Sequence, residues 1–414
     1  MNILTLNCGS SSLKFALFED NRKEALRKGE ISWANGKREH SRLSVWPENG
    51  REEQTVVAAR DDQAAAGWAI KTALGTGRGR TSIVDVVGHR IVHGGIEFRE
   101  STLVDERVKA AVAKLGQLAP LHNPPALKAI EAAESIFPGV PQVAVFDTAF
   151  YAFLEPKAYV YPLPYGYYKH WGIRRFGFHG ISHAYCAARA AELLRRPLAE
   201  LNLIICHLGG GCSATAVRGG KAIATTTGFS PLDGLMMGTR PGSLDPGILI
   251  ALQQQHGLTL EEIEHALSCS SGLLGVSGIS PDLAEIETAA DRGDERAQLA
   301  FEMFADRVRS AIGGLAVTLG SLDALIFTDR IGETSPALRA RVCAGLELLG
   351  LQLDRARNGT SPYDIDIATP GSRARLLAIH TQEELMIARE AGRIVNAAGV
   401  GGLTLNALKA DPEN

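Results

Sequence analysis

The apolar positions of the chain form short runs that end at Gly/Ser turns, and one such pattern occurs twice. ILTLNCGSSSLKFALF (residues 3–18) and LIICHLGGGCSATAV (residues 203–217) both follow the order strand, Gly/Ser turn, strand. Short apolar runs bounded by turn residues predict buried strands. The two copies are about 200 residues apart, whereas solenoid repeats span about 20–50 residues, so we predict a duplicated domain. Two unrelated hairpins that share glycine turns are the alternative.

Helical and strand patterns alternate through the rest of the chain, which indicates the α/β class. Apolar residues at helical spacing, with capping and stop residues at the ends, predict helices over Asp61–Leu74, Ala126–Ile136, Ser335–Leu348 and Glu383–Asn396, and two helices within Asp282–Leu319 that are separated at Arg292–Asp294. Apolar or β-branched runs predict buried strands over Ser82–Val92, Val143–Phe146, Ala324–Phe327 and Arg375–Ile379. We expect a turn over Thr328–Glu333, and further strands and loops over residues 21–60.

Composition narrows the class of protein. The chain has 414 residues, so we expect two or more domains, and 45% hydrophobic with 21% charged residues is typical of a folded chain. The net charge of -3 argues against a protein that binds nucleic acid or an anionic membrane, because both need a basic surface. The longest apolar stretch, near Ile312–Phe327, contains Asp323 and predicts no membrane span, and the N-terminal run predicts a strand rather than a signal peptide. Six scattered cysteines without a CxxC pair indicate reduced thiols and a cytoplasmic location.

The two Gly/Ser turns are candidate phosphate sites. Successive backbone N–H groups of a glycine turn can surround phosphate oxygens, although neither turn has the GxxxxGK[ST] spacing of a P-loop. In the first turn, Ser10, Ser12 and Lys14 add hydroxyl and ammonium groups, and Asn7 offers a neutral oxygen to a metal ion. Plain hairpin turns are the alternative for either one.

Isolated polar residues near glycine turns and strand ends are further candidates. Arg90 and Arg240 lie in Gly-rich segments, where a buried charge is costly unless it is paired and where a guanidinium suits carboxylate or phosphoryl oxygens. Asp147 directly follows a buried strand, where ligand sites of α/β proteins lie, although a turn or N-cap role is the alternative. His179 is a candidate donor to an anion, and His183 is expected to pack inside a helix. No zinc site is expected, because HExxH is absent.

These candidates together favour one reaction class. The carboxylates of Glu383 and Glu384, within Thr381–Glu384, are either magnesium ligands or solvated charges in the first turn of a helix. His89 and His93 are expected to be structural. Two phosphate turns, two arginines, a histidine and two carboxylates fit phosphoryl transfer, which depends on positioning and charge stabilisation more than on covalent chemistry.

The motifs taken together resemble the acetate kinase family, and the resemblance favours a duplicated domain over chance hairpins. Nearly the whole chain carries the family's motifs in the family's order and spacing: LNCGSSSLKF, GHRIVHGG, HNPP, VFDTAF, YGYYKHWGIRRFGFHGISH, HLGGG, LMMGTRPGSLDP, IGETSP and TQEELMIARE. The resemblance implies two duplicated ribonuclease H-like lobes of the actin-like ATPase superfamily with an active-site cleft between them. Residues 1–148 with 385–414 would form the N-terminal lobe, and residues 149–384 the C-terminal lobe on the nucleotide side. It also implies a homodimer.

The resemblance further implies transfer of a phosphoryl group from ATP to acetate, with Mg²⁺ or Mn²⁺, to give acetyl phosphate and ADP. By the same resemblance the catalytic residues are Asp147, Arg90, His179 and Arg240, and the metal ligands are Asn7 and Glu383. The acetate site is expected to consist of Arg90, Val92, Leu121, Phe178 and Pro231. The ATP contacts are expected to be Lys14, His207, Leu208, Gly209, Gly210, Gly211, Asp282, Leu283, Ala284, Arg330, Ile331, Gly332, Glu333 and Thr334.

Chemistry and three departures from the family pattern refine this expectation. Carboxylic acids have a pKa of about 4–5, so acetate is ionised at neutral pH, no general base is needed, and we expect Asp147 to orient Arg90. Where the family usually has Asn, Gly and Arg, this chain has Gly210, Arg330 and Ala284. One interpretation is that Arg330 replaces the guanidinium that the family usually has at position 284, so that ATP still binds. Alternatively, Arg330 blocks adenosine, and the expected donor is then pyrophosphate. Propionate is the alternative acceptor.

Overall fold

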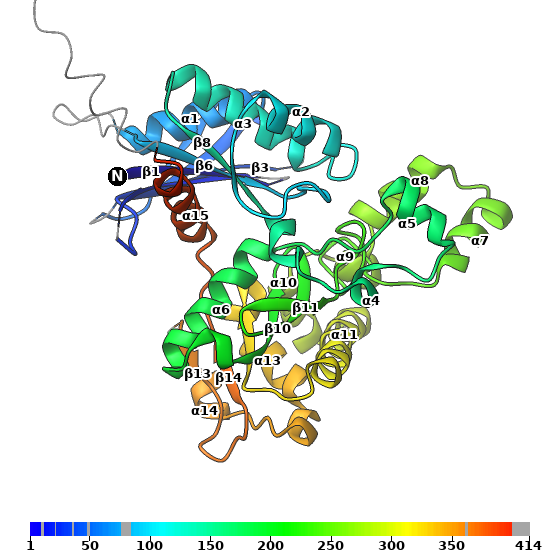
Figure 1. Ribbon diagram of the computed structural model, residues 1–414. Coiled ribbons are helices and arrows are strands. Elements are labelled where there is room, and N and C mark those ends of the chain that lie inside the picture. The colour runs from blue at the N-terminus through cyan, green and yellow to red at the C-terminus, as the bar shows by residue number, and fades with distance from the viewer. Residues whose placement is uncertain are drawn as a thin grey trace, which may run out of the picture. The chain divides into compact units, whose positions relative to one another are not determined.

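The computed structural model describes residues 1–9, 12–20, 22–34, 37–47, 50–75, 84–360 and 363–399. The chain divides into two compact units (Figure 1). The first comprises Met1–Ala152 and the segment that begins at Gln382, and the second comprises Phe153–Thr381. Ser10 of the first predicted turn, the predicted strand start at Ser82, and residues 400–414 lie outside the described residues.

A mixed sheet forms the centre of the first unit. Its strands are β1 (Asn2–Cys8), β2 (Ser12–Glu19), β3 (Arg27–Ala34), β4 (Lys37–Pro47), β5 (Glu53–Val57), β6 (Val86–Ile91), β7 (Thr102–Leu103) and β8 (Gln142–Phe146). They lie in the order β5-β4-β3-β2-β1-β6-β8-β7. From β1 to β5, each strand pairs antiparallel with the next one along the chain. β6 is parallel to β1, and β8 is parallel to β6.

Helices cover both faces of this sheet. They are α1 (Asp62–Leu74), α2 (Glu106–Leu115), α3 (Asn123–Ile136) and α15 (Glu383–Ala397). α1 and α3 pack on one face, and α15 packs against β1, β6 and β8 on the other (Figure 1). Gly88 on β6 permits the close approach of α15, since a Cβ there would lie 2.8 Å from Cγ2 of Ile387. The C-terminal helix therefore completes the core of the N-terminal sheet.

The second unit repeats the same strand arrangement. Its strands are β9 (Asn202–Leu208), β10 (Cys212–Arg218), β11 (Lys221–Thr225), β12 (Ala324–Thr328), β13 (Ile365–Asp366) and β14 (Arg375–Ala378), in the order β11-β10-β9-β12-β14-β13. β9, β10 and β11 pair antiparallel, whereas β12 is parallel to β9 and β14 is parallel to β12. The same sequence of pairings joins β1, β2, β3, β6 and β8, so the predicted duplication is confirmed.

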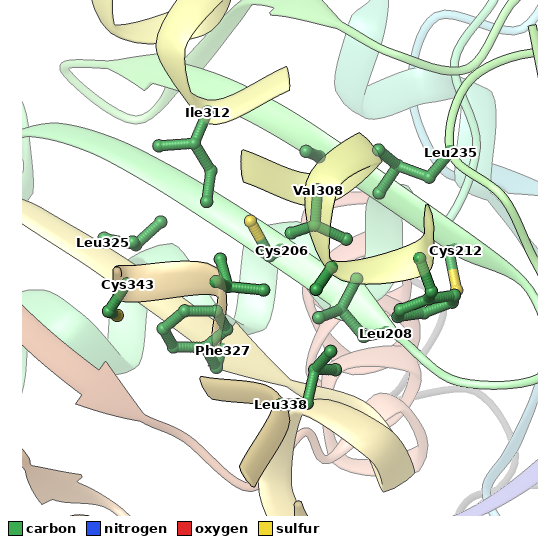
Figure 2. Close-up of a cluster of buried hydrophobic side chains, with 14 of the residues drawn as sticks. Cys206, Leu208, Cys212, Leu235, Val308, Ile312, Leu325, Phe327, Leu338 and Cys343 are labelled. Atoms are coloured by element: carbon green, nitrogen blue, oxygen red, sulfur yellow. The ribbon is translucent and has the colours of Figure 1, made fainter. Parts of the chain in front are cut away.

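The helices of the second unit enclose a large apolar core. They are α4 (Pro156–Tyr159), α5 (Tyr165–Trp171), α6 (Gly180–Leu194), α7 (Pro246–His256), α8 (Leu260–Cys269), α9 (Gly272–Ser277), α10 (Leu283–Asp291), α11 (Glu295–Leu319), α12 (Asp329–Thr334), α13 (Pro336–Cys343) and α14 (Arg355–Asn358). Figure 2 shows Val308 and Ile312 of α11 packed with strand residues such as Cys206 and Phe327. Burial raises the pKa of the Cys212 thiol in this core to about 12. None of the helices among the described residues combines the length and apolar character needed to span a bilayer.

Several predicted boundaries differ from the structure. The turn expected over Thr328–Glu333 is wrong, because Asp329–Thr334 form α12. The helix predicted to reach Leu348 ends at Cys343, since Gly345 adopts a left-handed conformation (φ 95°) that stops it. The break between α10 and α11 is confirmed, and Asp294 caps α11 by accepting a hydrogen bond from the N–H of Ala297 at 2.8 Å.

Candidate functional site

Arg90 is the centre of a hydrogen-bonded cluster in the first unit. It lies on β6, and Asp147 begins a 3-10 helix (Asp147–Tyr151) directly after β8, the neighbouring parallel strand. Parallel strands end at the same edge of a sheet, which brings the two side chains together. Arg90 donates from Nε and Nη2 to Oδ2 of Asp147, at 3.0 and 2.8 Å. Asp147 is fully buried, so water screens this pair only weakly.

Two further side chains orient the same guanidinium. Arg90 Nη1 donates to Oδ1 of Asn7 at 3.0 Å and lies 3.8 Å from Oε2 of Glu383. Burial alone would lower the pKa of Arg90, but the carboxylates of Asp147 and Glu383 outweigh it and raise the pKa above its ordinary value. The guanidinium therefore stays charged and is held in one orientation.

Asn7 and Glu383, the expected metal ligands, are in direct contact. Asn7 Nδ2 donates to Oε2 of Glu383 at 2.9 Å and to Oε1 of Glu384 at 3.1 Å. Magnesium prefers oxygen ligands and is usually held by one or two carboxylates together with substrate phosphates. The described residues contain no group of three His, Cys, Asp or Glu side chains that could hold a metal ion. In this cluster the Asn7 oxygen faces Arg90 and its amide nitrogen faces the two carboxylates, so the oxygen atoms available near the site are those of Glu383 and Glu384 together with Oδ1 of Asn7.

The resemblance assigns the metal-ligand role to Glu383 and not to Glu384, which the structure places in contact with Asn7 as well. The signal for Glu384 is the pair of adjacent carboxylates in the TQEE segment. The other predicted residues of the first unit differ in exposure: Val92 is buried after β6, Lys14 is exposed opposite Asn7 in the β1–β2 hairpin, and Leu121 is 57% exposed.

His89 and His93 are buried, in agreement with their expected structural role. His89 Nε2 lies 2.8 Å from Oε1 of Gln142. The backbone of His93 forms two hydrogen bonds with the side chain of Asn123, at 3.1 and 2.9 Å. Burial lowers the pKa of each imidazole to about 4, so both are neutral near pH 7.

In the second unit, His179 and Arg240 converge on the glycine turn after β9. His179 precedes α6 and adopts a left-handed backbone conformation (φ 59°). A Cβ built on Gly211 would lie 3.1 Å from Nε2 of His179 and 3.2 Å from Nη2 of Arg240. The missing side chain of Gly211 therefore leaves space that is bordered by one nitrogen of the His179 ring and one of the Arg240 guanidinium.

Arg240 differs from Arg90 in its charge balance. Its Nη1 donates to the carbonyl oxygen of Pro231 at 2.9 Å, and no carboxylate of the described residues forms an ion pair with it. Burial lowers the pKa of Arg240, because the charged form loses its hydration. Arg240 is half-buried, and a partly desolvated cation without a counter-charge is unfavourable, so an anionic ligand would provide the missing negative charge.

The remaining residues of the glycine turn have distinct surroundings. The His207 ring stacks on His179 with 4.3 Å between ring centroids, and its Nε2 lies 3.3 Å from Oδ2 of Asp329. A Cβ on Gly209 would collide with this carboxylate. A Cβ on Gly210 would have no neighbour within 4 Å, so this position faces open space.

The residues expected to contact adenosine are linked to one another. Arg330 forms an ion pair with Asp282, and Asp282 also caps α10 by accepting a hydrogen bond from the N–H of Ala284 at 2.8 Å. The Thr334 hydroxyl donates to the carbonyl oxygen of Arg330 at 2.7 Å. Three of the expected contacts have side chains buried in the core, so only their backbone can reach a ligand: Leu208, Leu283 and Ile331.

Glu333 and Gly332 hold α12 in place. Glu333 Oε1 accepts hydrogen bonds from the N–H groups of Asp329 and Thr381, both at 2.9 Å. Arg339 donates to the carbonyl oxygen of Gly332 at 2.8 Å. In this structure the Glu333 carboxylate is engaged within the protein.

Comparison with known proteins decides the family. Residues 2–389 match the acetokinase family. The chain belongs to that family. An acetate kinase of Cyanothece sp. is 47% identical over 407 residues, which cover 95% of this chain and 98% of that protein. An acetate kinase of Gloeobacter violaceus is 48% identical over 402 residues, with 94% of this chain and 98% of that protein covered.

Solved structures of the family agree with the fold. Porphyromonas gingivalis acetate kinase matches with a TM-score of 0.87 and 38% identity over 95% of this chain and 99% of that one. A propionate kinase from Francisella tularensis matches with a TM-score of 0.86 and 35% identity over 95% and 99%. The predicted α/β class with two duplicated lobes of the actin-like ATPase fold is confirmed. As a member of the acetokinase family, the chain is a phosphotransferase with a carboxyl group as acceptor.

Proposed function

We propose that the chain is an acetate kinase that transfers the γ-phosphoryl group of ATP to acetate, reversibly and with Mg²⁺, to give acetyl phosphate and ADP. The names of its relatives support this activity. The observation that carries the proposal is the contrast between two arginines. Arg90 is neutralised and oriented by Asp147, whereas Arg240 is half-buried without a carboxylate partner and is suited to bind an anion.

The proposed mechanism is direct in-line attack. An acetate oxygen forms a bond to the γ-phosphorus while the bond from that phosphorus to the β–γ bridging oxygen breaks, and the electron pair leaves with ADP. Arg90 binds and orients the acetate carboxylate. Arg240 and His179 donate to the equatorial oxygens of the phosphoryl group, where the transition state spreads its charge. Asp147 acts on Arg90 rather than on a proton, because acetate is already ionised.

The metal belongs to the donor side of this proposal. Asn7, Glu383 and Glu384 would hold Mg²⁺, which when bound offsets the negative charge of the donor phosphates. The exposed ammonium of Lys14 and the backbone N–H groups of the HLGGG turn (residues 207–211) would bind phosphate oxygens.

Pyrophosphate as donor is the second candidate, and one observation favours it. Arg330 is tied to Asp282 by an ion pair, so two residues that were expected to border adenosine are bound to each other. ATP remains the first candidate, because Arg330 is 58% exposed and an exposed ion pair is worth only about 0–1 kcal/mol.

The acceptor is proposed to be acetate, with propionate as a weaker substrate. Val92 and Phe178 are buried, Pro231 is half-buried, and these side chains would contact a short apolar tail. One additional methylene changes binding by only about 1–3 kcal/mol, so the site would discriminate modestly.

A substrate panel tests the proposal. Enzyme, Mg²⁺ and hydroxylamine are incubated with acetate or propionate and with ATP, GTP or pyrophosphate, and the acyl hydroxamate is measured. We expect the highest kcat/KM with ATP and acetate, and loss of product with Arg240→Ala. Product with pyrophosphate alone would identify the second candidate, and no product above the enzyme-free blank with any pair would refute both.

A homodimer and a cytoplasmic location complete the proposal. No residue of α7 is buried, and its apolar side chains Ile248 and Ile250 are 48% and 56% exposed. An exposed apolar helix supports a subunit interface, and sedimentation equilibrium should give twice the mass of one chain. All six cysteines are free thiols, which supports a reducing compartment.

A further inference from the structure

Ser213 lies between two histidine rings next to the proposed phosphoryl site. Its Oγ on β10 is 2.9 Å from Nδ1 of His179 and 2.8 Å from Nε2 of His183. The two histidines are four residues apart at the start of α6, which places them on one side of the helix. Ser213 and His183 are fully buried. No water is needed to connect the three side chains.

Ser213 has a single hydroxyl proton, and this links the tautomer of His179 to the tautomer of His183. A serine hydroxyl carries one proton and can donate one hydrogen bond, although it can accept more than one. Ser213 can therefore donate to only one of its two nitrogen partners, and the other nitrogen must carry its own hydrogen. The tautomer of His179 is thus linked to that of His183.

The position of Nε2 of His179 decides which of the two tautomers can act on a phosphoryl group. His179 Nε2 borders the space at Gly211 together with Nη2 of Arg240. A neutral imidazole donates from Nε2 only if Nδ1 is the acceptor. Because Nη2 of Arg240 borders the same space and a neighbouring cation disfavours a charged imidazole, we consider the neutral form of His179. Ser213 must then donate to Nδ1 of His179 and accept from Nε2–H of His183.

We propose that Ser213 and His183 are positioning residues that keep neutral His179 in the tautomer with its proton on Nε2, aimed at the phosphoryl oxygens. The effect on rate rests on the proposed function, whereas the tautomer itself is a property of the free protein. The hydrogen-bond chain runs from His183 Nε2–H to Ser213 Oγ, and from Ser213 Oγ–H to His179 Nδ1.

Neighbouring groups support the proposed order. Thr215 Oγ1 lies 3.3 Å from the same nitrogen, Nε2 of His183, and 3.0 Å from Oγ1 of Thr225, so a hydrogen on His183 Nε2 has two hydroxyl oxygens as acceptors. The charged and titratable groups around the His179 ring include His183, His207 stacked on it, Arg240, and Asp329 behind His207.

Kinetics of matched variants test the proposal. Ser213→Ala should lower kcat about tenfold, the cost of about one hydrogen bond, and leave the KM for acetate unchanged. In this variant the neutral His179 ring can carry its proton on either nitrogen. The protonated ring, by contrast, carries a hydrogen on both Nδ1 and Nε2. The kcat of the variant should therefore rise, relative to the wild type, as the pH falls and the imidazolium forms. A structural defect would lower kcat equally at all pH values.

Substitutions of His183 provide the paired control. His183→Gln keeps an N–H donor near the Nε2 position and should retain near-wild-type kcat, whereas His183→Leu should behave like Ser213→Ala. Circular dichroism and thermal melting confirm that each variant is folded. Equal activity and equal pH profiles for Ser213→Ala and the wild type would overturn the proposal.

A spectroscopic measurement separates this inference from the proposed function. ¹⁵N-histidine NMR of the free protein at pH 8, with His179→Asn for assignment, should show the proton of His179 on Nε2 in the wild type and on both nitrogens in exchange in Ser213→Ala. A wild-type proton on Nδ1 would overturn the proposal. If the protein forms no acyl phosphate, the proposed function is refuted. The NMR spectrum of the free protein would still show which tautomer His179 adopts.

Discussion

A single oxygen of Asp147, Oδ2, accepts hydrogen bonds from both Nε and Nη2 of Arg90. The carboxylate is fully buried, and the guanidinium also donates to Asn7. An aspartate engaged in this way is a poor proton acceptor, because protonation would weaken two charge-assisted hydrogen bonds. Its geometry instead fixes the direction of Arg90.

The first prediction separates orientation from proton transfer at this pair. Arg90→Ala should lower kcat about 10³–10⁵-fold, as does removal of an arginine that stabilises a phosphoryl transition state. Asp147→Asn keeps an acceptor oxygen and should cost less, with a pH profile of unchanged shape. Steady-state kinetics from pH 5.5 to 9 measure both. Loss of a titrating limb in Asp147→Asn would show that the aspartate acts as a base.

The second prediction concerns two adjacent glycines. Gly211→Ala places a methyl group about 3 Å from Nε2 of His179 and Nη2 of Arg240, so it should displace these donors and lower kcat up to about 100-fold. Gly210→Ala meets no atom within 4 Å and serves as the matched control. Comparable losses in both variants would mean that backbone freedom of the turn, rather than the space at Gly211, limits the rate.

The third prediction tests the ion pair between Arg330 and Asp282. Arg330→Gly removes the pair and should lower the KM for ATP by up to about fivefold, the equivalent of about 1 kcal/mol. The KM for acetate should not change. Asp282→Asn breaks the ion pair while it keeps a side-chain oxygen that can cap α10, so it should act in the same direction. A higher KM for ATP in Arg330→Gly would instead show that the guanidinium contacts the nucleotide.

The fourth prediction is a loss of stability in acid. Burial lowers the pKa of His89 and of His93 from the ordinary histidine value of 6.5, which applies to the unfolded chain, to about 4 in the folded protein. Between these values the unfolded chain binds protons that the folded protein does not, so stability is full above pH 6.5 and falls as the pH decreases to 4. Each histidine contributes up to about 3 kcal/mol to this loss.

Urea denaturation at several pH values checks this expectation. His89→Gln should flatten the pH dependence between pH 6.5 and 4, whereas His256→Gln, which changes an exposed histidine, should leave it unchanged. An identical slope in His89→Gln and the wild type would contradict the assignment.

Features that depend on local pattern could be predicted from the sequence. The strand–turn–strand repeat, the break between helices at Arg292–Asp294 and the position of Asp147 after a strand all follow from neighbouring residues. The six residues of α12 are too few to show a helical period, and the stop at Gly345 depends on its left-handed conformation. Local pattern therefore specifies most elements but not all of their ends.

Contacts between distant residues could not be predicted in this way. Arg330 and Asp282 are 48 positions apart, and Ser213 is 30 positions from His183. Ser213 follows a glycine turn and looks like any strand serine, because its function arises only when β10 packs near the start of α6. His179 was already a candidate anion donor from the sequence, whereas the side chains that orient it emerged only from the structure.

The placement of α15 on the N-terminal sheet has a consequence for biosynthesis. All of Phe153–Thr381 is translated between the strands of the first unit and the helix that covers them. At about 5–20 residues per second, this interval lasts roughly 10–50 s. The nascent chain therefore exposes an apolar sheet face on the ribosome until α15 emerges, and chaperones and proteases have that long to bind it.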